Sequence, residues 1–415
     1  MLKRFSAKQY RNVEADGLEF RRVTLLVGPN NGGKSNLIDA LRFHADIHRE
    51  QEKGSAFHAL IERRKYGDVL RRSVTPPGTV ELKWEYEHGP YRRTTFDIAM
   101  RIARSESFPA GFFVSRDILR VVDPSSDRLL EFRVDETNPQ EVIWQKRDTA
   151  GGPVVQKKKP FTPDDFVYGQ IRFGPEPEAQ DTSSNGGYPR LGEPKWFAGD
   201  IERQTFRSGS QLSPSQIAAS AKRNLSILSL DETGSELVNV LNNLERRHND
   251  FLDPFTERLR EMLSGLERMR IDDVSDQYKS LKLKIDGQWF RLDELSEGTL
   301  KMLALGLLFF TPEKASLLSI DEPELNLHPA WLRVLGKWAF GATGADQVIL
   351  STHSPDLLDA FTEGFRNGDV ALIVCDAKKG FRNIDPSALD SFFKEGWDLG
   401  DLYRVGEPAL GGWPW

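Results

Sequence analysis

The chain of 415 residues contains a single cysteine, Cys375, which excludes an intrachain disulfide framework and fits a reducing compartment. No apolar run approaches the roughly 18–20 residues of a membrane-spanning helix, so we expect no membrane association. The first residues lack the apolar stretch of a secretory signal. Internal repeats and sustained heptads are also absent, which argues against solenoids and coiled-coil arms. These absences predict a cytoplasmic globular protein.

An excess of positive charge is missing as well. The net charge is −6, with 28% charged residues, which does not indicate nucleic-acid binding. Local basic clusters occur at residues 63–65, 71–72, 92–93 and 157–159. Such clusters are usually solvated surface, and the alternative is that at least one contacts phosphate. Nucleic acid therefore stays a candidate partner.

The most informative segment is residues 28–35, which read Gly-Pro-Asn-Asn-Gly-Gly-Lys-Ser. They fit the phosphate-loop pattern G-x-x-x-x-G-K-[ST], between a predicted buried strand at 22–27 and a predicted helix that begins near residue 36. The loop can direct backbone N–H groups at a phosphate at the positive end of the helix. Lys34 would reach the outer phosphates, and the Ser35 hydroxyl would bind Mg²⁺. The candidate phosphate-binding residues are Gly28, Asn30, Asn31, Gly32, Gly33, Lys34, Ser35 and Asn36.

A second motif consists of acidic residues after an apolar run. Residues 317–320 predict a buried parallel strand that delivers Asp321 and Glu322 to its carboxyl end, where α/β sheets bind ligands. Asp321 could share a Mg²⁺ ion with Ser35, and Glu322 could polarise an attacking water. An acidic pair after a strand is weak evidence alone, and the phosphate loop makes it strong.

Two further segments carry polar groups at element ends. Ser296 and Gly298 precede a predicted helix at 300–308 and would form a second anion site, although Ser296 could equally be an ordinary N-cap. A predicted strand at 348–352 ends at His353, which could hydrogen-bond a γ-phosphate or be structural.

Together these motifs resemble the ABC-type ATPase head shared by RecF, SMC-like and OLD-family proteins, and above all the OLD-related "AAA" ATPases of bacteria. The resemblance covers residues 1–45 and 280–365. By position, residues 28–35 match the Walker A loop, 295–298 the signature motif, 320–322 the end of Walker B, 324–329 the D-loop and His353 the switch histidine. The tail at 397–403 is also similar to this group.

The resemblance implies an α/β fold: a P-loop ATPase head with a mixed sheet and flanking helices, carrying a large α+β insertion between Walker A and the signature. We expect an ATPase core at 1–50 and 280–375, the insertion at 51–279 and a C-terminal extension at 376–415. Within the insertion, residues 79–147 predict strands, 148–200 long loops and 234–269 helices with apolar stripes. Residues 280–285 and 288–292, joined by Asp286 and Gly287, predict a hairpin.

The resemblance also implies ATP and Mg²⁺ as ligands, and catalysis by Glu322, His353 and Lys34. In this group, heads dimerise around ATP, with the Walker A loop of one head facing the signature of the other. We therefore expect a homodimer or higher homo-oligomer. No second acidic cluster follows His353, so we expect no Toprim nuclease domain, and a nuclease or other effector would be a separate chain.

Three functions remain open at this point. The first is an ATPase that controls a nuclease or nucleic-acid-processing partner in bacterial defence against phage or plasmids. The second is a RecF-like repair protein that binds DNA directly. The third is an ATP-binding switch with negligible turnover.

Overall fold

The chain divides into two compact units. The first comprises residues 1–21, 30–205 and 373–383, and the second comprises 22–29, 206–372 and 384–415. The computed structural model describes residues 1–51, 69–70, 78–88, 92–102, 112–123, 128–135, 138–147, 152–160, 172–173, 190–191, 206–209, 211–219, 221–222, 224–376 and 380–410.

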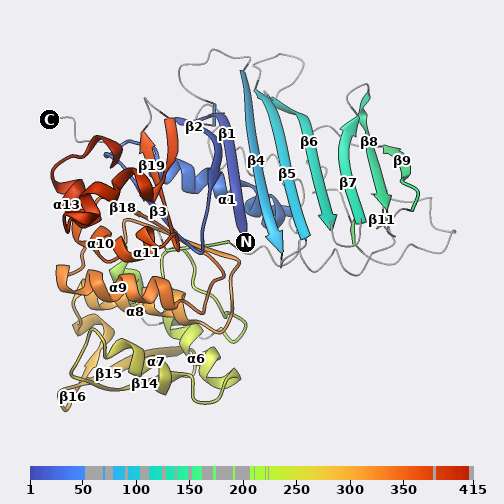
Figure 1. Cartoon of the computed structure of the whole chain (residues 1–415). Helices are drawn as coiled ribbons and strands as arrows, with labels where there is room; N and C mark the ends of the chain where they lie inside the picture. The colour runs from blue at the N-terminus through green and yellow to red at the C-terminus, as the bar shows by residue number, and fades with distance from the viewer. Residues whose placement is uncertain are drawn as a thin grey trace. The chain divides into compact units, whose positions relative to one another are not determined.

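The first unit is built on a sheet in which neighbouring strands run in the order β20-β2-β1-β4-β5-β6-β7-β8-β9 (Figure 1). All of these pairs are antiparallel except β2 with β20. The strands are β1 (Leu2–Tyr10), β2 (Val13–Glu19), β4 (Gly78–His88), β5 (Arg92–Ile102), β6 (Phe112–Asp123), β7 (Arg128–Asp135), β8 (Asn138–Arg147), β9 (Val155–Pro160) and β20 (Gly380–Ile384). The short strands β10 (Arg172–Phe173) and β11 (Arg190–Leu191) pair in parallel.

Apolar and charged side chains alternate along the strands of this unit, which explains why these segments form strands with one buried face. In β4, Val80, Leu82 and Trp84 are buried, while the charged residues between them are half-exposed. Helix α1 (Lys34–Gln51) packs against the inner part of the sheet, where the rings of Tyr10 and Phe43 meet edge to face at 6.1 Å. The strands predicted at 79–86, 129–134 and 141–144 are thereby confirmed as parts of β4, β7 and β8.

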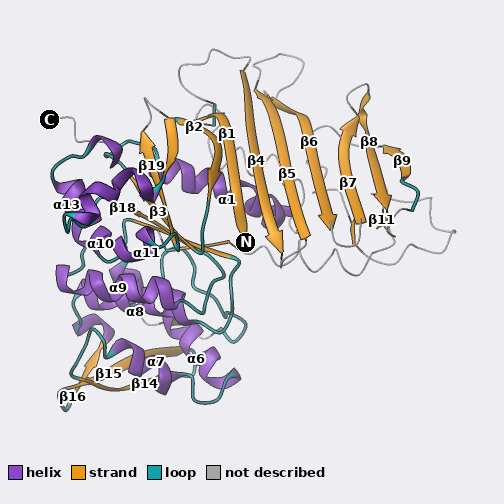
Figure 2. Cartoon of the chain, viewed as in Figure 1, coloured by secondary structure: helices purple, strands orange, loops and turns teal. Residues whose placement is uncertain are grey.

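The second unit contains a parallel sheet in the order β12-β17-β18-β3, of which β18 and β3 are labelled in Figure 2. Its strands are β12 (Phe206–Ser208), β17 (Leu317–Asp321), β18 (Val348–Thr352) and β3 (Val23–Val27). Every residue of β3 and β18 is buried, as expected for parallel strands that are covered on both faces. Strand β19 (Val370–Asp376), which includes the buried Cys375, begins in the second unit and ends in the first.

Helices cover this parallel sheet. The central one, α8, is apolar along almost its whole length and packs against α7 and α9. The helices of the unit are α5 (Pro214–Ile217), α6 (Leu237–Arg247), α7 (Leu252–Leu259), α8 (Glu297–Phe310), α9 (Pro329–Gly341), α10 (Pro355–Asp359), α11 (Thr362–Arg366), α12 (Asp390–Lys394) and α13 (Leu399–Arg404), with short 3₁₀ helices η2 (Leu292–Glu294), η3 (Pro386–Leu389) and η4 (Pro408–Leu410).

A small antiparallel sheet completes the second unit. It contains β13 (Ala221–Lys222), β14 (Leu266–Ser275), β15 (Tyr278–Ile285) and β16 (Gln288–Arg291). The predicted hairpin is confirmed: Ile285 pairs with Gln288, and Asp286 and Gly287 both have positive φ, at 47° and 82°. The helical prediction for 234–269 was wrong at its end, because α7 stops at Leu259 and Leu266 begins β14, whose cross-strand pairing with β15 outweighs the local apolar spacing.

The expected mixed α/β fold with a large sheet and flanking helices is confirmed. The domain boundaries expected from the sequence stay a prediction. The loops predicted at 148–200 lie largely outside the described residues, as do the basic clusters at 63–65 and 71–72. Within the part of the chain that the structure describes, no helix is both long and apolar enough to cross a membrane.

Candidate functional site

Three neighbouring parallel strands of the second unit end at the same edge of its sheet. Asp321 at the end of β17 pairs with Ser351 of β18, and Thr352 pairs with Val27 at the end of β3. Parallel strands that end in register place the residues that follow them side by side. The acidic residues after β17, His353 after β18 and Gly28 after β3 therefore emerge together at this edge.

The two predicted acidic residues are held by β18. The Ser351 hydroxyl donates a hydrogen bond to Oδ1 of Asp321. The backbone N–H of Glu322 donates to the carbonyl and to the hydroxyl oxygen of Ser351, both at 3.1 Å. A single serine thus fixes the side chain of Asp321 and the backbone of Glu322.

Glu322 adopts a backbone conformation that is costly for its type. Its φ is +48°, in the left-handed region that favours glycine. Such a conformation costs on the order of 1–3 kcal/mol and persists only where surrounding contacts impose it. The φ of Asn326, four residues later, is +64°. We refer to residues 322–326 as the acidic turn.

Glu324, in the middle of the acidic turn, was not predicted as a site residue. Its Oε1 accepts hydrogen bonds from the Thr352 hydroxyl at 2.7 Å and from the backbone N–H of His353 at 3.0 Å. The side chain is only 8% exposed, and its other oxygen, Oε2, has no hydrogen-bond partner among the described residues. Glu324 therefore joins the end of β18 to the acidic turn.

The imidazole of His353 lies between two carboxylates. Its Nδ1 atom is 3.3 Å from Oε1 of Glu322 and 3.5 Å from Oε1 of Glu324. The Nδ1 atom is buried and makes no well-aligned hydrogen bond within the described residues. The structure therefore brings together His353 and Glu322, which the sequence had suggested separately.

A buried lysine reaches the acidic turn from α8. The Nζ atom of Lys301 donates to the carbonyl of Leu325 at 2.9 Å and to the carbonyl of Glu322 at 3.4 Å. Burial lowers the pKa of Lys301, and the negative charges of Glu324 and Glu322 oppose that effect. Sequence reasoning missed Lys301, because a lysine in an apolar helix does not reveal its partners.

The start of α8 is also in contact with the acidic turn. Ser296 is the N-cap of α8, and its Oγ accepts from the N–H of Thr299 at 3.2 Å. The capping alternative is therefore correct for the conformation seen here, and the anion-binding role stays a prediction. At Gly298, a Cβ atom would lie 2.8 Å from the carbonyl oxygen of Asn326, so only glycine permits this approach.

The first residues of the phosphate loop leave β3 within the second unit. The φ of Gly28 is +143°, a value that side-chain-bearing residues rarely adopt. The Tyr403 hydroxyl of α13 donates to the carbonyl oxygen of Gly28 at 3.4 Å. Burial, followed by the negative charge of Glu324, raises the pKa of Tyr403 to about 12, so the hydroxyl keeps its proton at physiological pH.

The rest of the phosphate loop belongs to the first unit. Helix α1 begins at Lys34, which is buried. The side chain of Asn36 donates to Oδ1 of Asn12 at 2.7 Å and accepts from Arg11 at 3.0 Å. The φ of Gly33 is +99°, and a Cβ atom there would lie 2.8 Å from Oδ1 of Asn12. The turn between β1 and β2 therefore supports this part of the loop.

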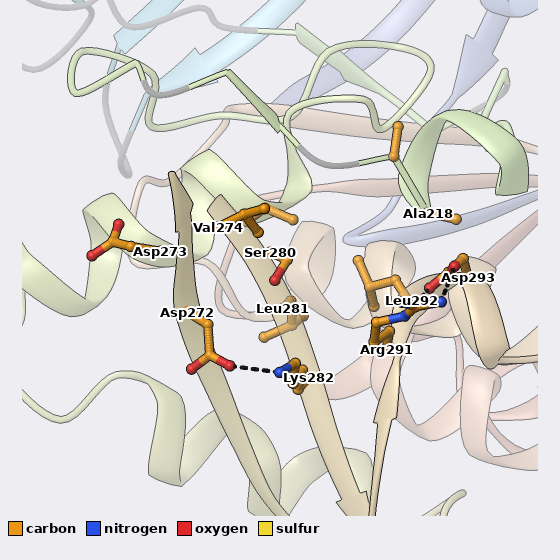
Figure 3. Close-up of a pocket in the computed structure, with 12 residues that line it drawn as sticks. Ala218, Asp272, Asp273, Val274, Ser280, Leu281, Lys282, Arg291, Leu292 and Asp293 are labelled. Atoms are coloured by element: carbon orange, nitrogen blue, oxygen red, sulfur yellow. Dashed lines mark hydrogen bonds and ion pairs between the residues drawn. The ribbon is translucent and has the colours of Figure 1, made fainter. Parts of the chain in front are cut away.

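A cavity of about 700 Å³ lies elsewhere in the second unit, next to β14, β15 and η2 (Figure 3). Its charged lining residues are paired: Lys282 with Asp272 at 3.0 Å, Arg291 with Asp293 at 2.8 Å, and Asp273 with Lys279 at 2.6 Å. These pairs leave the cavity without an evident charge for a phosphate to bind. The lining residues Leu292 and Asp293 belong to η2, which ends two residues before Ser296.

Comparison with known proteins adds a family. The model of the family described as "AAA domain, putative AbiEii toxin, Type IV TA system" matches residues 23–105 and 117–359. The chain belongs to this family. The match includes every predicted site residue of this chain, from Gly28 to His353. The matched ranges of this chain contain its phosphate loop and its acidic turn.

Two solved structures resemble the fold remotely. One is the "Crystal structure of the SmcHead bound to the C-winged helix domain of ScpA", with 12% identity, a TM-score of 0.47 and coverage of 92% of this chain and 97% of that chain. The other is the "SMC head domain from Thermotoga maritima", with 13% identity, a TM-score of 0.40 and coverage of 92% and 98%. A search among curated proteins finds no match.

Proposed function

We propose that this chain binds ATP together with Mg²⁺ and hydrolyses it at the edge formed by β17, β18 and β3. The observation that supports this most is the grouping of Asp321, Glu322 and His353 at the strand ends, where β3 also leads into the phosphate loop. A carboxylate beside an imidazole at the carboxyl end of parallel strands is suited to orient and deprotonate water.

Each residue has a distinct proposed role. Lys34 neutralises the outer phosphates, and the backbone N–H groups of Gly28 and of residues 30–36 bind the phosphate oxygens. Glu322 accepts the proton of the attacking water, and His353 donates a hydrogen bond to the γ-phosphate. Because His353 also lies beside Glu322, it can hold this carboxylate in place before ATP arrives.

The proposed magnesium ligands are a carboxylate and a hydroxyl. Asp321 has a carboxylate whose orientation Ser351 fixes, and the phosphate-loop pattern assigns the hydroxyl to Ser35. The described residues contain no group of three or more His, Cys, Asp or Glu side chains fit to hold a metal, and Mg²⁺ typically needs only one or two carboxylates plus substrate phosphates. When bound, the ion would neutralise charge on the phosphates during hydrolysis.

We further propose that the active form is a homodimer or higher homo-oligomer assembled by ATP, in which Ser296 and Gly298 of one chain complete the site of another. The N–H groups at the start of α8 are suited to bind an anion. ATP binding and hydrolysis would then shift the chain between associated and separate states.

The downstream role in this proposal is control of a separate nuclease or nucleic-acid-processing effector in bacterial defence against phage or plasmids. The family description supports a setting of this kind, since it names a putative toxin of a toxin–antitoxin system. Copurification of an effector whose activity depends on ATP and on Glu322 would test this part.

The Lys34→Ala variant tests the core of the proposal. Charge-assisted contacts to phosphate contribute about 1.5–3 kcal/mol each, so the variant should lose at least tenfold in ATP affinity by calorimetry. Lys337→Ala is the matched control, because Lys337 is an exposed lysine on α9. Equal ATP affinity and turnover in both variants would overturn the assignment of the phosphate loop.

A further inference from the structure

Lys301 is a buried cation whose two hydrogen bonds both end on the acidic turn. It lies on α8, five residues after the N-cap Ser296, and is 8% exposed. Its Nζ donates to the carbonyls of Leu325 and Glu322, at 2.9 Å and 3.4 Å. An ammonium group has three donors and no acceptor, so it suits a position where carbonyl oxygens converge.

We propose that Lys301 is a positioning residue that fixes the acidic turn against α8 and thereby holds the Glu322 carboxylate in the orientation that hydrolysis requires. The catalytic part of this inference rests on the ATPase function proposed above. Lys301 acts through the backbone of Glu322 and Leu325, and we assign it no contact with nucleotide.

The backbone of the acidic turn explains why such an anchor is needed. Both ends of the turn, Glu322 and Asn326, have positive φ, at 48° and 64°. Inside the turn, the N–H of Leu325 donates to the carbonyl of Glu322 at 3.2 Å, and directly after it the N–H of Leu327 donates to the carbonyl of Glu324 at 3.0 Å. Asparagine tolerates this conformation, whereas a glutamate holds it only where surrounding contacts impose it.

Two further contacts join α8 to the same turn. Gly298 approaches the carbonyl of Asn326 so closely that a Cβ atom would lie 2.8 Å from it. The side chain of Asn326 donates to Oε2 of Glu297 at 3.4 Å. Lys301 is therefore the buried charged member of a joint that spans the first two turns of α8.

This joint has a consequence for regulation. The start of α8 is the segment that we propose to face the nucleotide of a second chain, and Glu322 belongs to the nucleotide site of its own chain. A displacement of α8 would reach Glu322 through the hydrogen bonds of Lys301. The positive charge of Lys301 also attracts the negative charges of Glu324 and Glu322.

Hydrogen exchange of the nucleotide-free protein tests the structural part directly. Lys301→Met removes the donors but keeps an unbranched side chain, and Lys337→Met is the control on the exposed face of α9. We expect amides of residues 322–327 to exchange at least tenfold faster in Lys301→Met, with no change in the control. Unchanged exchange in this segment would overturn the proposal.

Turnover measurements test the catalytic part. Because misplacement of a catalytic group by about 1 Å can cost about 10²-fold, kcat of Lys301→Met should fall by about that factor while the Kd for ATP stays within about twofold of the wild type. Lys301→Arg keeps the charge and donors, so it should fold and recover at least tenfold of the lost kcat.

The outcomes separate the two proposals. Normal kcat in Lys301→Met, a parallel loss of ATP affinity, or equal turnover in the Met and Arg variants would each overturn the positioning role. Should Lys301→Met not fold, the Arg variant must still show intermediate kcat with normal ATP affinity. A wild-type chain without ATP hydrolysis would overturn the proposed function, and hydrogen exchange would still decide whether Lys301 holds the turn.

Discussion

The Nδ1 atom of His353 lies 3.3 Å from Oε1 of Glu322, although 30 intervening residues separate the two positions in the sequence. Parallel pairing of β17 with β18 brings them together, and Glu324 fixes the backbone of His353. The imidazole therefore lies beside the carboxylate of Glu322. In the proposed mechanism, a rotation of His353 toward a phosphate would leave this carboxylate free to accept a proton from water.

The Glu322→Gln variant should bind ATP normally and hydrolyse it roughly 10²–10⁴-fold more slowly, which is the usual contribution of a positioned general base. The amide has nearly the same shape, so the acidic turn should persist. Single-turnover hydrolysis and ATP titration measure the two effects, with Glu395→Gln as an exposed control. A Gln variant with normal turnover would place the base elsewhere.

Glu324→Ala tests the anchor between the acidic turn and β18. It would leave the Thr352 hydroxyl and the N–H of His353 without their acceptor, and buried groups of this kind cost about 1–3 kcal/mol each when unsatisfied. For the two groups together we expect a loss of unfolding free energy of about 2–6 kcal/mol in urea titrations, together with lower kcat. Glu324→Gln, which retains an acceptor oxygen, should lose less, and equal losses would argue against this anchor.

Local sequence patterns were sufficient for the elements that carry the site. The apolar runs before Asp321 and His353 predicted β17 and β18, and the cap residue Ser296 predicted the start of α8. Each of these signals lies within a few residues of the feature that it predicts. The carboxyl ends of parallel strands then place Asp321, Glu322 and His353 at one edge without knowledge of the connecting chain.

Contacts between distant segments could not be predicted in this way. The side chain of Lys301 donates to the carbonyl of Leu325, and the hydroxyl of Tyr403 donates to the carbonyl of Gly28. Both hydrogen bonds form only when the helices pack on the sheet. No periodicity identifies the partner of a buried polar side chain. The prediction of a helix through Leu266 failed for a related reason, because pairing with β15 is set by residues almost twenty positions later.

Tyr403→Phe tests whether the C-terminal segment supports the phosphate loop. The hydroxyl donates to Gly28, and one net hydrogen bond contributes about 0.5–1.5 kcal/mol to stability. We expect a decrease of unfolding free energy in that range and a weaker affinity for ATP, because the first turn of the loop loses a contact. Tyr278→Phe is the control, since Tyr278 is 43% exposed on β15. An unchanged ATP affinity would limit Tyr403 to a structural role.

The proposed oligomer requires residues of two chains to meet at one ATP, and mixed variants can show this. Ser296→Arg should bind ATP but not hydrolyse it, because the long side chain would block the site of the partner chain. Ser296→Ala is the matched control: it removes the same N-cap, which costs about 0.5–2 kcal/mol, without blocking anything. If capping is the entire role of Ser296, the two variants should lose similar stability and keep similar turnover.

Mixing Ser296→Arg with Lys34→Ala should then restore part of the activity. Each heterodimer would contain one complete site, with the phosphate loop from the Ser296→Arg chain and the signature segment from the Lys34→Ala chain. In a random mixture about half of the dimers are mixed and each has one working site of two, so ATPase activity should approach a quarter of the wild-type value. Heterodimers are verified by differently tagged chains. Demonstrated heterodimers without any recovery of ATP hydrolysis would exclude a site shared between two chains.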